Sequence, residues 1–332
     1  MDITGKRILV IGGAGLIGSH VVEELLKEDV EKVIVYDNFC RGTLENLEEA
    51  LKDPRCHIFE IGGDILQTDI LNAAMKGVDG VVHLAALWLL QCYEFPRAAF
   101  DVNIRGTFNA LEACVASNVK QLVYSSSASV YGDAVEEPMT EDHPYKNWTF
   151  YGATKIAGEQ MFRAYHKRYG LKGVSLRYMN VYGPRQDYKG TYIAVMMKIL
   201  DKIDKELAPI VYGDGSQAYD FIYVGDAARA NVCALKSDVP FGFYNVGRGI
   251  KTSIKELTEL ILRITGSDLP IQYQPAGQTF VTNRVGDPTA AERDLGFRWT
   301  VDLEDGLKRL IEWRRSHAEE VEKRREQAGI KD

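Results

Sequence analysis

The chain has 332 residues, 45% of them hydrophobic and 26% charged, with a formal net charge of −7. This composition predicts a globular protein with a sizeable core, and the negative charge argues against a basic surface for nucleic acid or anionic membranes. Five scattered cysteines without a CxxC pair predict neither a disulfide framework nor a metal site. The sequence shows no export signal, and its longest apolar run is the ten residues 81–90, so we expect a soluble, cytoplasmic protein.

The first predicted element is a strand at Arg7–Ile11, which runs directly into the segment GGAGLIG at 12–18 and then into an amphipathic helix. Strand, glycines and helix in this order are the context that makes a dinucleotide-binding fingerprint credible. Glycines permit a tight turn and a close approach of the backbone to a pyrophosphate, and the helix N-terminus offers unpaired N–H groups to that anion. We therefore assign cofactor contacts to Gly12, Gly15 and Gly18.

A second predicted strand, Lys32–Tyr36, ends in Asp37, nineteen residues after Gly18. A carboxylate at this place can accept hydrogen bonds from both ribose hydroxyls of NAD and would repel the 2′-phosphate of NADP. Arg41 complicates the choice, because arginine is how NADP is accommodated. We give Asp37 the greater weight and predict NAD as the cofactor.

Helical patterns separate the further strands that are predicted at 57–61, 79–83, 121–124 and 173–177. This alternation is typical of an α/β fold with a Rossmann-type, doubly wound parallel sheet, whose ligands lie at the carboxyl ends of the strands. Two segments at such ends are therefore candidates for cofactor contacts: Asp64 with Ile65, and Leu84, Ala85 and Ala86. For the second segment, simple packing explains the small side chains equally well.

Beyond residue 177 the pattern becomes irregular, and it returns to a helix and a strand over 223–247. Further helices are expected at 192–200, 254–265 and 303–317. We predict an NAD-binding domain of residues 1–179 plus 223–247 and a smaller α/β substrate-binding lobe of residues 180–222 plus 248–317. The charged tail, 318–332, is expected to be a solvated or frayed helix end.

A second group of candidate site residues comes from the serine-rich end of the 121–124 strand and from YGATK at 151–155. Tyr151 and Lys155 are four residues apart at the start of a predicted helix, so their side chains can share one pocket. Strand-end hydroxyls facing such a pair suit proton transfer at an alcohol carbon. Taken alone, YxxxK is more often a solvated helix turn, but the dinucleotide fingerprint upstream favours the catalytic interpretation.

With these motifs in order, the chain resembles the extended short-chain dehydrogenase/reductase superfamily, in its nucleotide-sugar epimerase/dehydratase branch. The motifs are GGAGLIG (12–18), DN (37–38), GDI (63–65), HLAA (83–86), VNIRGT (102–107), SSSASVYG (125–132), YGATK (151–155), RYMNVYGPRQ (177–186) and GDGSQAYDFIYVGD (213–226). The resemblance extends to about residue 315 and implies the same Rossmann fold.

The resemblance implies that Tyr151 is the acid/base, that Lys155 holds the ribose and lowers the pKa of Tyr151, and that Ser127 binds the reacting sugar oxygen. It implies that Asn103 is a cofactor-side residue that also steadies the active site, and that Asn180 binds the sugar diphosphate. Further cofactor contacts are implied at Leu16, Ile17, Asn38, Arg41, Gly42 and Tyr178.

Residues inside the motifs favour one reaction. Similar dehydratases and decarboxylases place an acid just after the catalytic Ser or Thr, where this chain has Ala128 and Ser129. We therefore expect an NAD-dependent, UDP-sugar 4-epimerase-like enzyme. Hydride passes from C4 to NAD, the 4-keto sugar rotates in the site, and hydride returns to the opposite face of C4. The alternatives are a sugar-nucleotide dehydratase or oxidoreductase on an unusual carbohydrate, and a non-catalytic NAD-sensing protein, which would have no need of a tuned phenol.

Two departures from the family pattern concern the substrate side. Where relatives have an arginine that clamps the diphosphate in RDFxYV, this chain has Tyr219. A second arginine is usual about ten residues before Asp287-Pro288, where this chain has Gly277. Arg185 and Arg284 are the candidates to replace that charge, and otherwise the substrate is not an ordinary uridine diphosphate sugar.

Two further expectations concern the sugar pocket and assembly. Trp88 and Gln91 are candidates to line a modified sugar pocket, although Trp88 suits a core position equally well. By resemblance, the protein is expected to form a homodimer through the helices around 96–117 and 151–169. The expected partner molecule is a nucleotide sugar, with no nucleic acid, membrane or metal.

Overall fold

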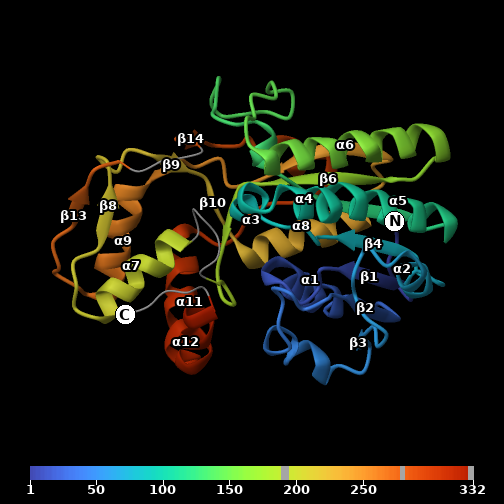
Figure 1. The fold of residues 1–332 in the computed structure, drawn as a ribbon, viewed down its shortest axis with the longest axis horizontal. Coiled ribbons are helices and arrows are strands. Elements are labelled where there is room, and N and C mark those ends of the chain that lie inside the picture. The colour runs from blue at the N-terminus through green and yellow to red at the C-terminus, as the bar shows by residue number, and fades with distance from the viewer. Residues whose placement is uncertain (188–193, 277–280, 328–332) are drawn as a thin grey trace.

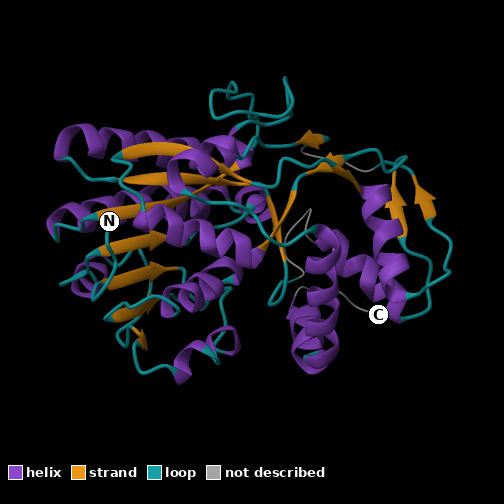
Figure 2. Ribbon diagram, turned by 180° about the vertical axis from the view of Figure 1, so that it is seen from behind, coloured by secondary structure: helices purple, strands orange, loops and turns teal. Residues whose placement is uncertain are grey.

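A computed structural model describes residues 1–187, 194–276 and 281–327. Its centre is a seven-stranded parallel sheet with the order β11-β6-β5-β4-β1-β2-β3 and helices on both faces (Figure 2). The strands are β1 (Arg7–Ile11), β2 (Lys32–Tyr36), β3 (Cys56–Ile58), β4 (Gly80–His83), β5 (Gln121–Ser127), β6 (Gly173–Tyr178) and β11 (Phe241–Val246). The predicted Rossmann-type, doubly wound sheet is confirmed.

Both faces of the sheet are buried by helices. α1 (Leu16–Leu26) and α8 (Val224–Lys236) cover one face, and α2 (Thr68–Ala74), α5 (Thr107–Ala116) and α6 (Phe150–Tyr169) cover the other. Successive side chains of a strand point to opposite faces, so in β1 Val10 joins the core under α1 while Leu9 joins the core under α5. Burial on both faces explains why these strands read as continuous apolar runs.

The serine strand is longer than the sequence indicated. We expected it to end at Tyr124, but β5 continues to Ser127 because residues 125–127 pair with residues 176–178 of β6. Polar serines carry no apolar signal, yet their backbone completes the ladder with β6. Ser127 is therefore fixed as the last residue of a central strand, with the short 3₁₀ helix η4 (Ala128–Val130) directly after it.

The helical region expected at 96–117 consists of three segments. They are α4 (Pro96–Ala99), the π-helix η3 (Phe100–Gly106) and α5, and the short α3 (Leu89–Glu94) precedes them. Asn103 lies in the middle of the π-helix. π-helical turns are wider than α-helical ones and occur frequently at functional sites, so this local widening draws attention to Asn103.

The remaining elements gather beyond the carboxyl ends of the sheet strands (Figures 1 and 2). Three small sheets pair β7 (Asn180–Tyr182) with β10 (Phe221–Tyr223), β8 (Ile210–Tyr212) with β13 (Gln272–Gln274), and β9 (Ala218–Tyr219) with both β12 (Thr252–Ser253) and β14 (Asn283–Arg284). Their helices are α7 (Ala194–Asp204), α9 (Ile254–Thr265) and α11 (Leu303–Ser316), whereas α10 (Thr289–Leu295) packs against β11 and α8 of the central layer. The expected start of α7 at Tyr192 lies outside the described residues, and the domain division stays a prediction.

The charged tail is not a solvated end, so that expectation is wrong for residues 318–327. They form α12 (Ala318–Gln327), which buries Val321 and Arg324 to 7% and 6% exposure. Lys323 also forms an ion pair with Glu45, at 2.9 Å, in the 3₁₀ helix η1 (Glu45–Leu47). Sequence reasoning missed this docking because its contacts join residues almost 280 positions apart.

The described residues contain neither a membrane-spanning helix nor a cluster of metal ligands. No helix within 1–187, 194–276 or 281–327 combines the length and apolar character needed to cross a membrane. The same ranges contain no cluster of three or more His, Cys, Asp or Glu side chains that would suit a metal ion.

Candidate active site

The glycine loop between β1 and α1 is shaped by contacts that exclude side chains. Gly12 has a φ of +82°, in the left-handed region that favours glycine. A Cβ on Gly18 would lie 2.0 Å from the carbonyl oxygen of Gly12, and a Cβ on Gly12 would lie 2.7 Å from the amide nitrogen of Ala85. The loop is therefore a cradle of bare backbone at the N-terminus of α1, as an anionic pyrophosphate requires.

A cleft of about 550 Å³ runs from this loop to the end of β5. Every predicted cofactor residue except Asn103 lines it: Gly12, Gly15, Leu16, Ile17, Gly18, Asp37, Asn38, Arg41, Gly42, Asp64, Ile65, Leu84, Ala85, Ala86, Tyr151, Lys155 and Tyr178. The loops after β1 to β5 thus converge on one site, because the carboxyl ends of parallel strands meet at one edge of a sheet.

Asp37 is held at the end of β2 by the backbone. One carboxylate oxygen accepts a hydrogen bond from the amide of Ala14 at 2.9 Å, and the other accepts one from the amide of Phe39 at 2.8 Å. Burial raises the pKa of Asp37, and these two hydrogen bonds oppose that rise. Each oxygen keeps a second lone pair for a ribose hydroxyl, so the residue fits the role assigned to it for NAD.

Arg41 lines the same cleft, but its charge is already matched. Its guanidinium donates two hydrogen bonds to Asp187, at 2.6 and 3.1 Å, and lies 4.3 Å from the ring centroid of Trp88. A guanidinium that is neutralised by a carboxylate is a poor receptor for a 2′-phosphate. This geometry supports NAD over NADP, and it places Trp88 at the cleft rather than in the core.

Asn103 acts from behind the cleft. Its side-chain oxygen accepts a hydrogen bond from the amide of Leu87 at 2.7 Å, and its Nδ2 donates to the Leu87 carbonyl at 3.0 Å. The same Nδ2 lies 3.1 Å from Oγ1 of Thr154, a residue between Tyr151 and Lys155 on α6. Asn103 thus ties the loop after β4 to the catalytic helix.

The three predicted catalytic residues meet at the end of β5. The Tyr151 hydroxyl is hydrogen-bonded to the side chain of Ser127, whose Oγ also accepts a hydrogen bond from the amide of Ser129 at 3.1 Å. Lys155 donates from Nζ to the carbonyl oxygen of Ser125 at 2.6 Å, and Nζ lies 5.7 Å from the Tyr151 ring centroid. This arrangement can hold an alcohol oxygen beside a phenol that exchanges protons with it.

The expected lowering of the Tyr151 pKa by Lys155 stays a prediction. Burial raises the pKa of Tyr151 to about 12; the hydrogen bond from Ser127 and then the charges of Arg41 and Arg284 oppose that rise. Burial also lowers the pKa of Lys155 to about 8, which weakens it as a source of positive charge. Burial is the largest influence on the pKa of both groups.

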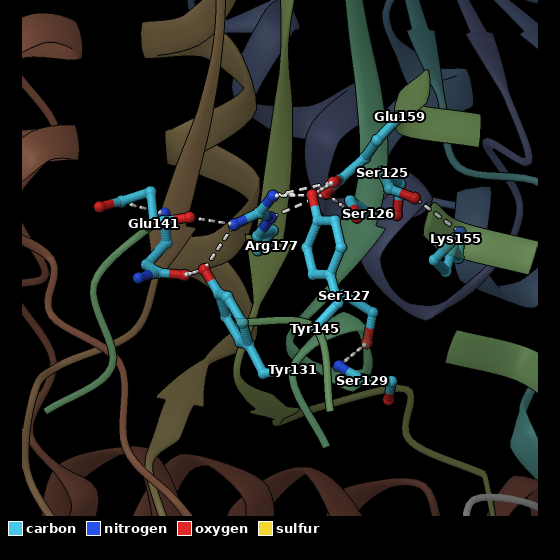
Figure 3. A network of polar contacts seen from close by, with 11 residues as sticks. Ser125, Ser126, Ser127, Ser129, Tyr131, Glu141, Tyr145, Lys155, Glu159 and Arg177 are labelled. Carbon is cyan, nitrogen blue, oxygen red and sulfur yellow. Dashed lines mark hydrogen bonds and ion pairs between the residues drawn. The ribbon is translucent and has the colours of Figure 1, made fainter. Parts of the chain in front are cut away.

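A buried polar network behind β5 was missed by the sequence analysis (Figure 3). Glu159 accepts hydrogen bonds from Arg177 at 2.8 and 2.9 Å, from the Ser126 hydroxyl at 2.6 Å and from the Tyr145 hydroxyl at 2.9 Å. Arg177 also donates to the Tyr131 hydroxyl at 2.8 Å. Both charged side chains are almost completely buried, at 1% and 0% exposure.

One signal in the sequence identifies Glu159 after the fact. It follows Tyr151 and Lys155 at the next helical repeat, four residues further along α6, and therefore lies on the same face. This face contacts Ser127, Ser125 and Ser126 in turn. The network therefore fixes the strand end that presents Ser127.

The predicted substrate residues divide into two groups. Asn180 and Arg284 line the cleft with Ser127 and Tyr151, and Arg284 also lies 3.4 Å from the hydroxyl of Ser129. The other two predicted substrate residues, Tyr219 and Arg185, are absent from the described lining of the cleft, and so is Gln91. Gly277 lies outside the described residues.

Those two residues, Tyr219 and Arg185, are used elsewhere. Tyr219 is 3% exposed and its hydroxyl donates to the carbonyl oxygen of Val281 at 2.8 Å. Arg185 forms an ion pair with Glu23 on α1. The structure therefore does not bring either side chain to the cleft, because both are engaged in packing between elements that the sequence does not place side by side.

Comparison with known proteins places this geometry in a family. Residues 8–247 match the model of the NAD dependent epimerase/dehydratase family. The chain is 33% identical to UDP-N-acetylglucosamine 4-epimerase from Methanobrevibacter ruminantium, solved in complex with UDP-N-acetylmuramic acid; the match covers 94% of this chain and 99% of that one, with a TM-score of 0.88.

Two more similar proteins differ in reaction. UDP-glucose 4-epimerase from Thermus thermophilus, solved with NAD, is 34% identical over 94% of this chain and 99% of its own, with a TM-score of 0.83. A dTDP-glucose 4,6-dehydratase of Actinoplanes sp. is 32% identical over 94% of this chain and 98% of its own length. With its glycine cradle, Asp37 and the Ser127–Tyr151–Lys155 constellation on one cleft, the chain belongs to the NAD-dependent epimerase/dehydratase family, an extended branch of the short-chain dehydrogenases/reductases with NAD as cofactor.

Proposed function

We propose that the protein is an NAD-dependent 4-epimerase of a nucleotide-diphosphate sugar, which it oxidises and re-reduces at C4 through a transient 4-keto sugar. The proposal is supported by the placement of an alcohol-handling group, Ser127 with Tyr151, on the same cleft as the dinucleotide cradle. The named epimerases that the chain resembles are in accord with it.

The observation that carries the choice of epimerase is the distribution of acids around the cleft. Among the described residues that line it, the carboxylates are Asp37 and Asp64. They follow β2 and β3, at least three strands away from β5 in the sheet. At the reacting end, Ala128 and Ser129 stand where an acid would assist loss of water, so the described site can move a hydride and a proton but offers no second acid for elimination.

The chain's own residues divide the work as follows. Tyr151 takes the proton of the C4 hydroxyl and later returns it, while Ser127 orients that oxygen. Lys155, charged below pH of about 8, offers positive charge beside the phenol and a donor for a ribose hydroxyl. NAD, when bound, supplies the acceptor and then the donor of the hydride. Asn180 and Arg284 are assigned to the sugar diphosphate.

A dehydratase or another oxidoreductase is the competing activity, since a dehydratase is among the similar proteins. A dehydratase requires an acid at the reacting carbon, and the described cleft does not present one there. A non-catalytic NAD sensor accounts for the cradle but not for a phenol hydrogen-bonded to a strand-end serine beside a buried lysine.

The deciding experiment is incubation of the purified holoprotein with a panel of UDP-, dTDP- and GDP-sugars, followed by NMR and mass spectrometry of the products. A 4-epimerase gives a product of unchanged mass with inverted configuration at C4. A 4-keto product that has lost one water would establish a dehydratase instead. No turnover, with no change of nicotinamide absorbance on mixing, would establish the sensor.

We also propose a homodimer through the surface of α4, η3, α5 and α6. Large apolar side chains are exposed there, with Phe100, Phe108 and Tyr169 at 51%, 43% and 48%. Apolar helix faces of this kind commonly mark contacts between chains. Light scattering at micromolar concentration should give twice the mass of the chain, and Phe108→Glu should return it to the monomer mass.

A further inference from the structure

Helix α12, which lies beside α11 in Figure 1, docks on the dinucleotide-binding fold through the buried side chain of Arg324. Arg324 lies 5.4 Å above the ring of Trp313 on α11 and pairs with Glu320 one turn earlier, at 3.0 Å from Nε. Its guanidinium crosses to the other side of the junction, where it donates at 2.6 Å to the side-chain oxygen of Asn46. It also donates to the backbone carbonyl of Arg185.

Asn46 connects Arg324 to the glycine loop through a second hydrogen bond. It is 2% exposed, and its Nδ2 donates to the carbonyl oxygen of Ala14 at 2.7 Å. The amide of the same residue, Ala14, donates at 2.9 Å to the Asp37 carboxylate. The amide group of Asn46 therefore has an acceptor facing Arg324 and a donor facing Ala14, so its orientation is fixed by both neighbours.

The peptide group of Ala14 has little room to move. A Cβ on Gly42 would lie 2.7 Å from the carbonyl carbon of Ala14, and the amide of Thr43 is 3.3 Å from the Ala14 oxygen. A displacement of Asn46 is therefore transmitted to the loop rather than absorbed by a gap. No residue of α12 is among the described residues that line the cleft, so any influence of the helix on the cofactor is indirect.

We propose that α12 is a positioning element for NAD: Arg324, through Asn46 and Ala14, holds the glycine loop and Asp37 in the conformation that receives the cofactor. α12 lies beyond residues 8–247, which the family model matches. Linkage makes the effect reciprocal, because a docked helix that favours NAD must in turn be held more firmly when NAD is bound.

Calorimetry of NAD binding tests the forward direction. Arg324→Met removes the contact to Asn46 and should weaken NAD binding by about fivefold or more, a usual size for coupling between linked sites. Lys323→Met is the matched control, because the neighbouring residue loses only an exposed ion pair with Glu45 and should bind NAD as the unmodified protein does.

Asn46→Asp separates the contact between Arg324 and Asn46 from the contact between Asn46 and Ala14. Aspartate still accepts from Arg324 but cannot donate to the Ala14 carbonyl, so α12 should stay docked while NAD affinity falls. Hydrogen exchange of residues 318–327 reports the docking. This variant also keeps the test decisive if Arg324→Met does not fold.

Hydrogen exchange tests the reverse direction in the unmodified chain. NAD-saturated protein should exchange the amides of 318–327 more slowly than NAD-depleted protein, although the helix does not line the NAD cleft. Unchanged exchange, or unchanged NAD affinity in both Arg324→Met and Asn46→Asp, would overturn the proposal and leave α12 a packing element. Neither readout involves a sugar, so an unsuccessful epimerase assay leaves this test intact.

Discussion

The cofactor end and the substrate end of the cleft are built on different principles. At the cofactor end, the loops after β1, β2, β3 and β4 belong to one sheet and approach the ligand largely with backbone and small side chains. At the substrate end, Ser127, Asn180 and Arg284 come from three separate sheets and approach with polar side chains. One end therefore depends on local turn geometry, and the other on how distant segments pack together.

The comparison explains why a motif is a reliable guide at one end only. A Cβ on Gly18 would lie 2.0 Å from the carbonyl oxygen of Gly12, so the shape of the loop itself requires a glycine there. Whether position 219 faces a ligand depends instead on β12 and β14, which flank β9 and are far away in the sequence. Five predictions test this contrast, beginning with the largest expected effect.

Loss of the reacting phenol should be the most damaging change at the substrate end. Tyr151→Phe removes the proton exchange and should lower kcat by about 10²- to 10⁴-fold. Stopped assays by NMR measure the rate, and the NAD content of the purified variant should stay close to that of the unmodified protein. Near-normal turnover would show that Tyr151 is not the acid/base.

Arg284 should carry the diphosphate, whereas Tyr219 should not. A charged hydrogen bond lost from Arg284→Ala should raise KM by about 10- to 100-fold with a smaller change in kcat. Tyr219→Phe is the control, because it removes the hydroxyl that donates to Val281 and no charge, so KM should not move. Equal increases in KM for the two variants would place the diphosphate at position 219 after all.

Restoring the family's arginine with Tyr219→Arg should not tighten binding of uridine diphosphate. Because position 219 is 3% exposed and packs beside Phe221, a guanidinium there would have to give up its hydration on burial. The variant should instead lower the melting temperature, with no gain in nucleotide affinity by calorimetry.

At the cofactor end, Asp37 should determine the choice of dinucleotide. Asp37→Ala removes a charged acceptor and should weaken NAD binding by about tenfold while NADP binding is unchanged or improved, so that the preference narrows. Titration of both dinucleotides measures it. Tight NADP binding to the unmodified protein would show instead that Arg41 exchanges Asp187 for the 2′-phosphate.

The smallest expected effect is a pH dependence that links the two ends. Lys155 has a folded-state pKa of about 8, so it loses its charge as the pH rises through that value, and kcat/KM should fall there. Between pH 8 and the ordinary lysine pKa the unfolded chain binds the extra proton, so the contribution of Lys155 to stability rises with pH. Activity and unfolding free energy should thus move in opposite directions. A kcat/KM that stays constant up to pH 9.5 would show that the charge of Lys155 does not contribute to the reaction.

Sequence reasoning recovered what is specified locally. The bounds of β1, β2 and α9 were as predicted, and the lining of the cofactor cleft followed from the glycine fingerprint and strand ends. Arg185 and Tyr219 were misplaced because their surroundings come from α1, β12 and β14. The motifs also do not show burial, which is the largest influence on the pKa of Tyr151 and raises it.

The buried pair of Glu159 and Arg177 also limits how this sequence can change over generations. Removal of one partner leaves an unpaired charge in the core, at a cost of about 3–5 kcal/mol, comparable to the whole stability of a marginal domain. Replacement of both by apolar residues is far less harmful to the fold, yet it needs two substitutions at positions 18 apart, each damaging alone. Descendants of this chain should therefore inherit the two residues as a unit, and the strand end beside them should drift more slowly than the exposed helices around it.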